Sequence, residues 1–351
     1  MEVEAFQRLD PENFYRRFVK NGVRPDGREL RAVRPISVDV GVLSEDRVQA
    51  SALVGLGSTK VLAGISLQVG HPSENTPMCG MLDVEVKLTP LSSSKFSSGR
   101  PSEQAQVLST FVKNSIVESG ALVLTDLAID DGSFAWKLCM DIVCLSFDGN
   151  LADATLMAAM GALMRLQLPG TSRIDDEIFV TGGEGTMEYS SGDDHASVAS
   201  VKLLWASAHK RFKKSFRTLP RAHSSCLAWS CFPLHSPPER LVDGFCVSRL
   251  LLYASETPTP LVVREVPVPL TCGVFDGIII ADPSLLEEDL LTTHVTVVST
   301  AEGKVCGVHK PGGSCASGKQ LNECLQLCQQ HAKQLTKTLE AAVRIQSGDE
   351  A

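Results

Sequence analysis

The sequence predicts a mixed α/β fold, and three observations support this prediction. Residues 136–147 are rich in Val, Ile, Leu, Cys and Phe and contain neither Pro nor Gly, which is typical of a long buried β-strand. Residues 151–168 place Ala, Met and Leu at helical spacing with little polar face, so this helix is expected to be buried against a sheet. Strand-like and helical stretches also precede and follow this unit, which excludes an all-helical or all-β protein.

The first part of the chain is expected to form one short helix and four strands. Asp10 is a suitable N-cap for a helix that begins at Pro11 and carries Phe14, Tyr15 and Phe18. The last of the four strands alternates between apolar and charged residues, as half-exposed strands do. The expected strands span residues 36–40, 47–54, 60–69 and 81–88.

The central strand and helix are joined by Asp148-Gly149-Asn150, and we expect a sharp turn there because Asp and Gly suit tight backbone geometry. A polar Ser-rich loop precedes another expected helix at residues 102–119. The expected strands of the later part span residues 274–281, 295–300 and 305–308. A Gly-rich turn then leads into a long helix at about residues 317–345, in which Cys324 and Cys328 are expected to face the core.

The composition indicates a globular protein with a sizeable core. The chain has 351 residues, 43% of them hydrophobic, and its longest charge-free apolar run is too short to span a bilayer. The acidic start of the chain predicts no secretory signal, so we expect the eleven Cys to be reduced thiols in the cytosol or nucleus. The net charge of −8 argues against a protein that grips nucleic acid alone through a broad basic face.

Residues 184–254 differ from the rest of the chain and are predicted to form an atypical basic insert. Helical and strand periodicity fail there, and Lys and Arg outnumber Asp and Glu although the whole chain is acidic. The insert could contact nucleic acid through basic groups and aromatic rings such as Trp205 and Trp229, or it could be disordered, which we consider the better interpretation. The predicted domains are therefore 1–183, the insert 184–254, and 255–351.

Two further features match known binding motifs only in part. Residues 310–314, Lys-Pro-Gly-Gly-Ser, could hold a phosphate, but they lack the full P-loop pattern and are better interpreted as a turn that begins a helix. Four potential zinc ligands in the insert do not have a standard spacing, so we expect no metal site and no cofactor. These ligands are His223, Cys226, Cys231 and His235.

Five stretches, taken in this order, resemble one known family. They are RPDGR, SKFSSGRPSEQAQVLSTFVKNSIVESGAL, GSFAWKLCMDIVCLSFDGNLADATLMAAMGAL, IIIADPSLLEEDLLTTHVTVV and HKPGGSCASG. Together they resemble the ribonuclease PH family, and within it the ring subunits of the exosome, over roughly residues 10–183 and 262–340. The resemblance implies a ribonuclease PH-like fold, a duplicated S5-type β-α sandwich of the α+β kind, in which the insert has no counterpart.

The resemblance also implies where a catalytic site would lie. Active members cleave the last phosphodiester of RNA with inorganic phosphate, which requires Arg or backbone N–H donors for the anion and an acid, usually Asp, for the leaving oxygen. They carry a Gly-Thr-Arg motif after the central strand, where this sequence has Gly-Asn-Leu-Ala-Asp at residues 149–153. The Arg is absent, and Asp153 would repel phosphate. We interpret Asp153 as a structural residue at the start of a helix.

Two more positions depart from the pattern of the active members. His294 stands where they place an Asp, and Lys113 beside Asn114 is what remains of a basic pair on the helix before the central strand. His294 could act as a general base, but a single strand His is more often structural. We therefore expect no catalytic residues. Lys95 and Arg100, on the Ser- and Gly-rich loop, are the candidate RNA-contacting residues.

The resemblance therefore implies a non-catalytic structural subunit of the RNA exosome ring, which helps to thread RNA for 3′-to-5′ processing and decay of ribosomal and messenger RNA. The expected partners are other ribonuclease PH-like ring subunits, cap subunits, a hydrolytic ribonuclease and RNA, with no membrane. The expected location is the nucleus, nucleolus and cytoplasm. The alternatives are an active phosphate-dependent 3′-to-5′ exoribonuclease and, with less support, a small-molecule enzyme that binds phosphate at residues 310–318.

Overall fold

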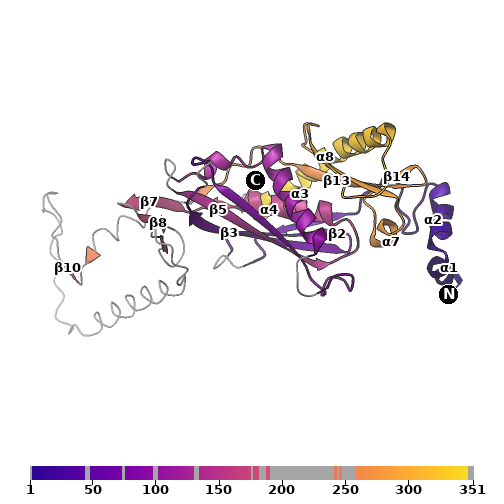
Figure 1. The fold of residues 1–351 in the computed structure, drawn as a ribbon, viewed down its shortest axis with the longest axis horizontal. Helices are drawn as coiled ribbons and strands as arrows, with labels where there is room; N and C mark the ends of the chain where they lie inside the picture. Colours follow the sequence, from indigo (N-terminus) through magenta and orange to yellow (C-terminus); the bar gives the residue numbers. More distant parts are fainter. Residues whose placement is uncertain are drawn as a thin grey trace, which may run out of the picture. The chain divides into compact units, whose positions relative to one another are not determined.

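The computed structural model describes residues 2–43, 48–72, 76–97, 102–129, 134–174, 177–181, 187–189, 241–242, 245–246 and 258–346. The chain divides into two compact units, one of residues 1–167 with 260–351 and one of residues 168–259. The first unit contains two sheets with helices packed against them, so the predicted mixed α/β fold is confirmed (Figure 1).

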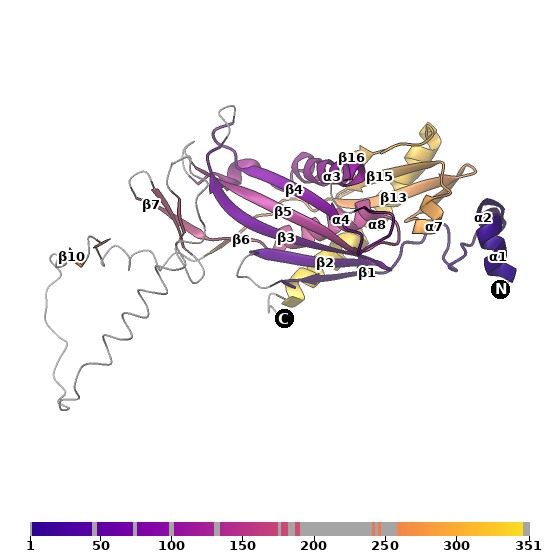
Figure 2. The same cartoon turned by 60° about the horizontal axis from the view of Figure 1, so that its bottom comes forward.

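The first sheet has five strands in the order β1-β2-β3-β5-β4. All neighbours are antiparallel except β4, which pairs with β5 in parallel. Figure 2 shows the strands side by side, with β1 and β4 at the edges. The strands are β1 (Ile36–Val40), β2 (Ala50–Leu56), β3 (Thr59–Gly70), β4 (Met81–Leu88) and β5 (Ala135–Ser146), close to the predicted ranges.

Two helices pack against this sheet, α3 (Glu103–Ser119) on β4 and α4 (Leu151–Arg165) on β2 and β3. From Leu151 to Leu163 every residue of α4 except Ala152 is buried, as its almost completely apolar sequence predicts. Helix α4 also packs against β13 of the second sheet, which explains why it has no exposed face. Helix α4 thus lies at the centre of the unit.

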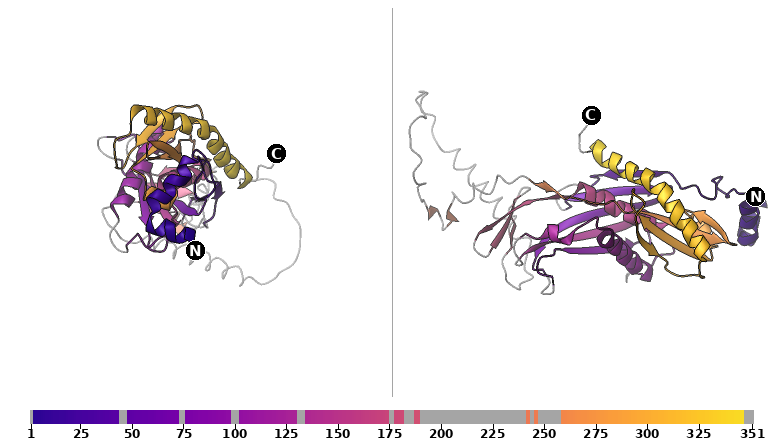
Figure 3. Two further views of the ribbon diagram at one scale, coloured as in Figure 1. Left: turned by 90° about the vertical axis from the view of Figure 1, so that its right-hand side faces the viewer. Right: turned by 90° about the horizontal axis from the view of Figure 1, so that it is seen from above.

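The second sheet has four strands in the order β14-β13-β15-β16, all antiparallel. They are β13 (Val268–Phe275), β14 (Ile278–Ala281), β15 (Thr293–Ser299) and β16 (Val305–His309). The long helix α8 (Gly318–Gln346) lies across this sheet (Figure 3). Cys324 and Cys328 are buried in the core between α8 and the sheet, which confirms their predicted position.

The prediction of one strand at residues 274–281 is wrong. The structure divides this range into the end of β13 and the whole of β14, with Phe275 paired to Ile278. Asp276 and Gly277 connect the strands with φ values of 47° and 82°. Two consecutive residues with positive φ form the tight hairpin turn for which Asp-Gly is a known signal, and this signal was missed among the neighbouring Ile residues.

The N-terminal segment forms two helices, α1 (Glu2–Leu9), which was not predicted, and α2 (Pro11–Lys20). Asp10 caps α2 as predicted, because its side chain accepts a hydrogen bond from the Asn13 N–H at 3.2 Å. Tyr15 and Val19 of α2 pack against Phe275 and Ile280 of the second sheet.

The second unit is described only by its backbone. Its strands β7 (Gly170–Ile174), β8 (Glu177–Thr181) and β9 (Met187–Tyr189) form an antiparallel sheet in that order, and β10 (Leu241–Val242) pairs with β11 (Phe245–Cys246). Most of the predicted insert 184–254, including the four potential zinc ligands, lies outside the described residues, so its disorder stays a prediction.

The remaining short elements are η1 (Leu124–Leu127), β6 (Gln167–Leu168), β12 (Thr259–Pro260) and α7 (Leu285–Glu288). Helix α7 follows β14 and carries two acidic side chains, Glu287 and Glu288. Within the part of the chain that the structure describes, no helix has the length and apolar character needed to cross a membrane.

Candidate functional site at the start of helix α4

The turn between β5 and α4 adopts a left-handed backbone conformation at two successive residues. Gly149 has φ 79° and Asn150 has φ 54°, which confirms the predicted sharp turn. A Cβ atom on Gly149 would lie 2.6 Å from the backbone nitrogen of Leu285, the first residue of α7. The turn therefore packs directly against α7, and only glycine leaves room for this approach.

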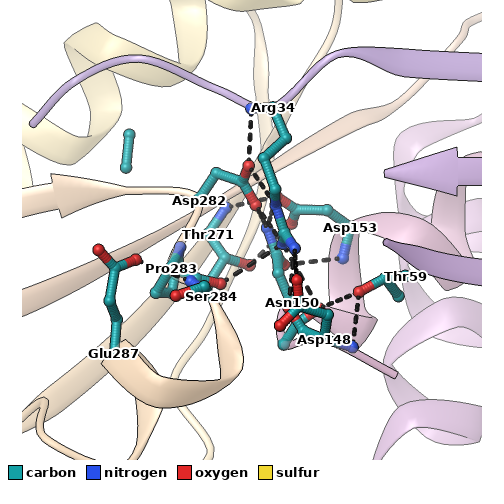
Figure 4. A network of polar contacts seen from close by, with 12 residues as sticks. Arg34, Thr59, Asp148, Asn150, Asp153, Thr271, Asp282, Pro283, Ser284 and Glu287 are labelled. Carbon is teal, nitrogen blue, oxygen red and sulfur yellow. Dashed lines mark hydrogen bonds and ion pairs between the residues drawn. The ribbon is translucent and has the colours of Figure 1, made fainter. Parts of the chain in front are cut away.

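A buried ion pair between Arg34 and Asp282 lies beside this turn (Figure 4). Asp282 is fully buried, and Arg34 donates to it from Nε at 2.9 Å, from Nη2 at 2.8 Å and from its backbone N–H at 2.8 Å. Burial by itself would raise the pKa of Asp282, but the hydrogen bonds and charge of Arg34 lower it below its usual value. Asp282 is therefore held as a carboxylate.

The same guanidinium also binds the turn. Nη1 of Arg34 donates to the carbonyl oxygen of Asp148 at 2.7 Å. The hydroxyl of Thr59 donates to the carbonyl of Gly149 at 2.8 Å and accepts from the Asp148 N–H at 3.0 Å. The side-chain amide of Asn150 donates to Asp282 at 2.7 Å. Three segments, the one before β1, the β5–α4 turn and the end of β14, thus meet at one carboxylate.

Asp153 connects helix α4 to strand β13. One of its oxygens accepts from the Thr271 N–H at 2.9 Å and from the Asn150 amide at 2.7 Å, and the other accepts from the Thr271 hydroxyl at 2.7 Å. Burial raises the pKa of Asp153 to about 6, although these hydrogen bonds act in the opposite direction. The carboxyl group is fully used in holding α4 to the second sheet, which agrees with the structural role predicted for it.

The backbone N–H of Asn150, at the start of α4, is already bound to a side chain of the same protein. It donates to Oε1 of Glu288 at 2.6 Å. Burial raises the pKa of Glu288 to about 7, and the hydrogen bond from Asn150 partly opposes this effect. N–H groups at helix starts are common anion-binding groups, and this one is bound by a carboxyl group of the same protein.

Two arginines of the RPDGR stretch belong to the same network. Arg24 is fully buried and forms an ion pair with Glu287 at 3.4 Å, and the Tyr15 hydroxyl donates to Glu287 at 2.5 Å. Nη1 of Arg28 lies 3.2 Å from the Asp282 carboxylate. The motif therefore has a structural role, which is to tie the N-terminal segment to β14 and α7. From the sequence, no role was predicted for these two arginines, for Arg34, for Asp282 or for either glutamate.

A cavity of about 280 Å³ lies beside the turn and α7. Its lining residues are Lys95, Phe96, Ser97, Ser102, Gln104, Phe147, Leu285, Glu288 and Asp289. Lys95, a predicted RNA-contacting residue, forms an ion pair with Asp289 at 2.8 Å and lines this cavity. Arg100, the other predicted residue, lies outside the described residues. RNA contact by either residue stays a prediction.

Of the other candidate residues, His294 contacts this network through a hydrogen bond with the backbone of Glu288. His294 is half-buried on β15, its pKa is lowered by burial, and its Nε2 atom has no hydrogen-bond partner. Lys113 and Asn114 are exposed on α3. Lys310 donates to the carbonyls of Gly312 and Gly313 at 2.7 and 3.1 Å, so its ammonium group closes its own turn before α8. Among the described residues, no group of three or more His, Cys, Asp or Glu side chains could hold a metal ion.

Comparison with known proteins identifies the family. A model of the 3′ exoribonuclease family, ribonuclease PH domain 1, matches residues 32–169, and the model of domain 2 matches residues 265–330. Together the two matches cover more than half of the chain. The chain belongs to the ribonuclease PH family. The predicted ribonuclease PH-like fold is thereby confirmed, and the two matched parts leave residues 170–264 between them.

Curated relatives are exosome components of archaea. The chain is 28% identical over 323 residues to exosome complex component Rrp42 of Methanopyrus kandleri, covering 92% of this chain and 93% of the relative. It is 35% identical over 174 residues to Rrp42 of Aeropyrum pernix, covering 50% of this chain and 62% of the relative.

Solved structures share the fold. A chain of the Archaeoglobus fulgidus exosome with RNA bound to the active site matches with a TM-score of 0.66 and 24% identity, covering 93% of this chain and 96% of that chain. A chain of an archaeal exosome core matches with a TM-score of 0.64 and 22% identity, covering 97% and 100%.

Removing the guanidinium of Arg34 is expected to destabilise the protein strongly. Arg34→Ala leaves the buried Asp282 carboxylate without its main partner, and breaking a buried ion pair in this way costs about 3–5 kcal/mol. Arg31→Ala is the matched control, because Arg31 forms an exposed ion pair with Glu323 and should change stability by less than about 1 kcal/mol. Chemical denaturation followed by tryptophan fluorescence measures both values. Equal effects of the two substitutions would contradict the role given to Arg34.

Gly149→Ala is expected to destabilise the protein more than Gly120→Ala. Both glycines have φ 79°, so both variants carry a left-handed alanine, at a cost of about 1–2 kcal/mol. Only Gly149 places the new Cβ against backbone, whereas the space around Gly120 is open, so Gly149→Ala should lose about 1–3 kcal/mol more. Thermal and chemical denaturation of the two variants give this difference directly, and a difference of zero would mean that the turn does not touch α7.

Asp153→Asn should become increasingly stabilising relative to the wild type as the pH rises from 4 to 7. In the unfolded chain the Asp153 carboxyl group loses its proton near pH 3.8, whereas in the folded protein it keeps the proton up to about pH 6. Between these two pH values the folded state binds more protons, so the stability of the wild type falls as the pH rises. Asn does not titrate, so the stability of Asp153→Asn relative to the wild type rises by up to roughly 3 kcal/mol, since each tenfold change in proton affinity is about 1.4 kcal/mol.

The hydrogen bonds explain why Asn is tolerated at this position. Its amide can donate to the Thr271 hydroxyl, which lies 2.8 Å from the Thr296 hydroxyl and can donate there in turn. Asp153→Ala is the contrasting variant, because it leaves the buried Thr271 and Asn150 donors without an acceptor, which costs about 1–3 kcal/mol of stability for each donor. Denaturation curves at several pH values test both expectations, and a pH-independent difference between Asp153→Asn and the wild type would contradict them.

Proposed function

We propose that this protein is a non-catalytic structural subunit of an exosome ring. The observation that carries the proposal is that the donor groups at the start of α4 are already bound within the protein. Its N–H donor is bound to Glu288, and the guanidinium beside it, Arg34, is bound to Asp282. No Arg occurs in residues 149–153, where active members of the family carry one. The site therefore offers an incoming phosphate neither a free donor nor a free cation among these groups.

The acidic residues around the turn support the same conclusion. Asp148 lies in the turn itself, Glu288 accepts the Asn150 N–H, and the nearby Lys95 is paired with Asp289. A phosphate dianion beside an RNA chain needs positive charge, and this site has an excess of carboxyl groups. His294, at the position where active members have an Asp, is half-buried with a lowered pKa and would be neutral near pH 7.

The assembly part of the proposal is supported by the relatives and the fold. The archaeal relatives are named exosome components, and the matching solved chains come from exosome cores. We propose that the chain pairs with other ribonuclease PH-like subunits in the ring, and that the complete complex includes cap subunits, a hydrolytic ribonuclease and RNA. Its acidic net charge of −8 suits a subunit whose main contacts are with protein.

The finer assignments belong to the same proposal. Among ring subunits, the sequence motifs most resemble the one called ribosomal RNA-processing protein 43, whereas the curated relatives are named Rrp42. We propose a role in processing and decay of ribosomal and messenger RNA, in the nucleus, nucleolus and cytoplasm. Lys95 and Arg100 are the proposed RNA-contacting residues.

Two measurements test the proposal together. The tagged full chain expressed in cells should co-purify with other ribonuclease PH-like subunits, and the purified chain alone should not degrade RNA in the presence of phosphate. An active member of the family assayed in parallel provides the positive control. Phosphate-dependent release of nucleoside diphosphates by the isolated chain would establish the alternative, an active exoribonuclease. Failure to co-purify with any ring subunit would contradict the structural role.

A further inference from the structure

The cavity beside α7 combines two kinds of lining that a phosphate site would not have. Part of the lining is apolar and aromatic, formed by Leu285 and by Phe96 and Phe147, whose ring centroids are 5.2 Å apart at an interplanar angle of 45°. Glu288 and Asp289 add carboxyl groups to the lining. Among the described residues of the lining, Lys95 is the only cationic one, and it is paired with Asp289. The lining therefore favours a positively charged ligand.

Glu288 is the group in this cavity that lacks a counter-ion. Its Oε1 accepts the Asn150 N–H, but within the described part of the chain no Lys or Arg lies within ion-pair distance of it. Arg34 and Lys95 act on it only from farther away. A partly buried carboxylate without a cationic partner is unfavourable, and a cation that entered the cavity would stabilise it.

The cavity geometry distinguishes among possible cations. A metal ion needs several oxygen, nitrogen or sulfur ligands, and the described residues provide no such set. At about 280 Å³ the cavity is smaller than most small-molecule sites and suits one long side chain. Aromatic rings attract cations, and a planar guanidinium can stack on a ring while it donates to a carboxylate at its edge. Lysine can do only one of these well.

We infer that this cavity receives an arginine side chain of a neighbouring protein subunit, with the guanidinium bound to Glu288 and packed beside Phe96 and Phe147. The inference rests on the proposed function, because it takes the neighbour to be a subunit of the same ring. The cavity beside the β5–α4 turn then serves in protein assembly.

The first test uses the isolated full chain and small probes, so it does not depend on ring assembly. N-acetylarginine methylamide is titrated into the protein and its binding followed by NMR, with N-acetyllysine methylamide and adenosine monophosphate in parallel. The arginine probe should bind saturably and more tightly than the other two. Glu288→Gln should weaken it at least about tenfold, which corresponds to about 1.4 kcal/mol.

Glu288→Gln removes the negative charge at position 288 without disrupting the fold. Gln at position 288 can still accept the Asn150 N–H, so the turn keeps its hydrogen bond, and a thermal denaturation curve checks the fold. Glu302→Gln is the matched control, because Glu302 is exposed and lies outside the cavity lining. It should leave probe binding unchanged. Equal binding by wild type and Glu288→Gln, or binding of adenosine monophosphate in place of the arginine probe, would overturn the inference.

A second test distinguishes failure of the inference from failure of the proposed function. Co-purification of ring subunits is compared for the wild type, Glu288→Gln and Glu302→Gln. The inference predicts that only Glu288→Gln reduces recovery of a neighbouring subunit, by several-fold. If the wild type recovers no ring subunit, the proposed function fails. If all three recover the subunits equally, the ring role stands and the inferred arginine site is wrong.

Discussion

The rest of this structure depends on the interactions of the Asp282 carboxylate. It is fully buried at the end of β14 and binds Arg28 and Arg34, from the segment before β1, and Asn150, from the β5–α4 turn. A buried ion pair contributes little net stability compared with a well-packed apolar alternative, but it requires its partners in one arrangement. In this protein that requirement aligns the segment before β1, the β5–α4 turn and the second sheet.

This alignment determines what the turn can do chemically. Once Arg34 holds the Asp148 carbonyl and Asp282 holds Asn150, helix α7 lies against Gly149 and places Glu288 on the Asn150 N–H. The family's fold is thus retained, while the donors that would bind an anion are satisfied within the chain.

The sequence alone predicted the fold well where the signal was local. The apolar periodicity of α4, the Asp10 cap of α2 and the burial of Cys324 and Cys328 all depend on residues within a few positions of one another. The β13–β14 hairpin was missed because the Ile residues after Asp276-Gly277 extend an apolar run that resembles one strand. Helix α1 was missed because its eight residues give only a short periodic pattern.

The site was harder to predict, because its partners are far apart in sequence. Asp282 and Arg34 are separated by 248 residues, and Glu288 and Asn150 by 138. The absence of Arg from residues 149–153 is visible in the sequence, whereas the hydrogen bond from the Asn150 N–H to Glu288 is not. The RPDGR stretch was recognised, yet its arginines gave no sign that they bind acidic residues near position 285. Such pairings follow from topology, which single-sequence patterns do not specify.

The most direct test of this account is the binding of inorganic phosphate to the purified full chain, measured by ³¹P NMR beside an active member of the family. The account predicts that the active member shows saturable binding and that this chain shows none, because Glu288 and Asp282 already hold the donors near the start of α4. Saturable binding of phosphate by this chain, abolished by a substitution in the β5–α4 turn, would contradict it.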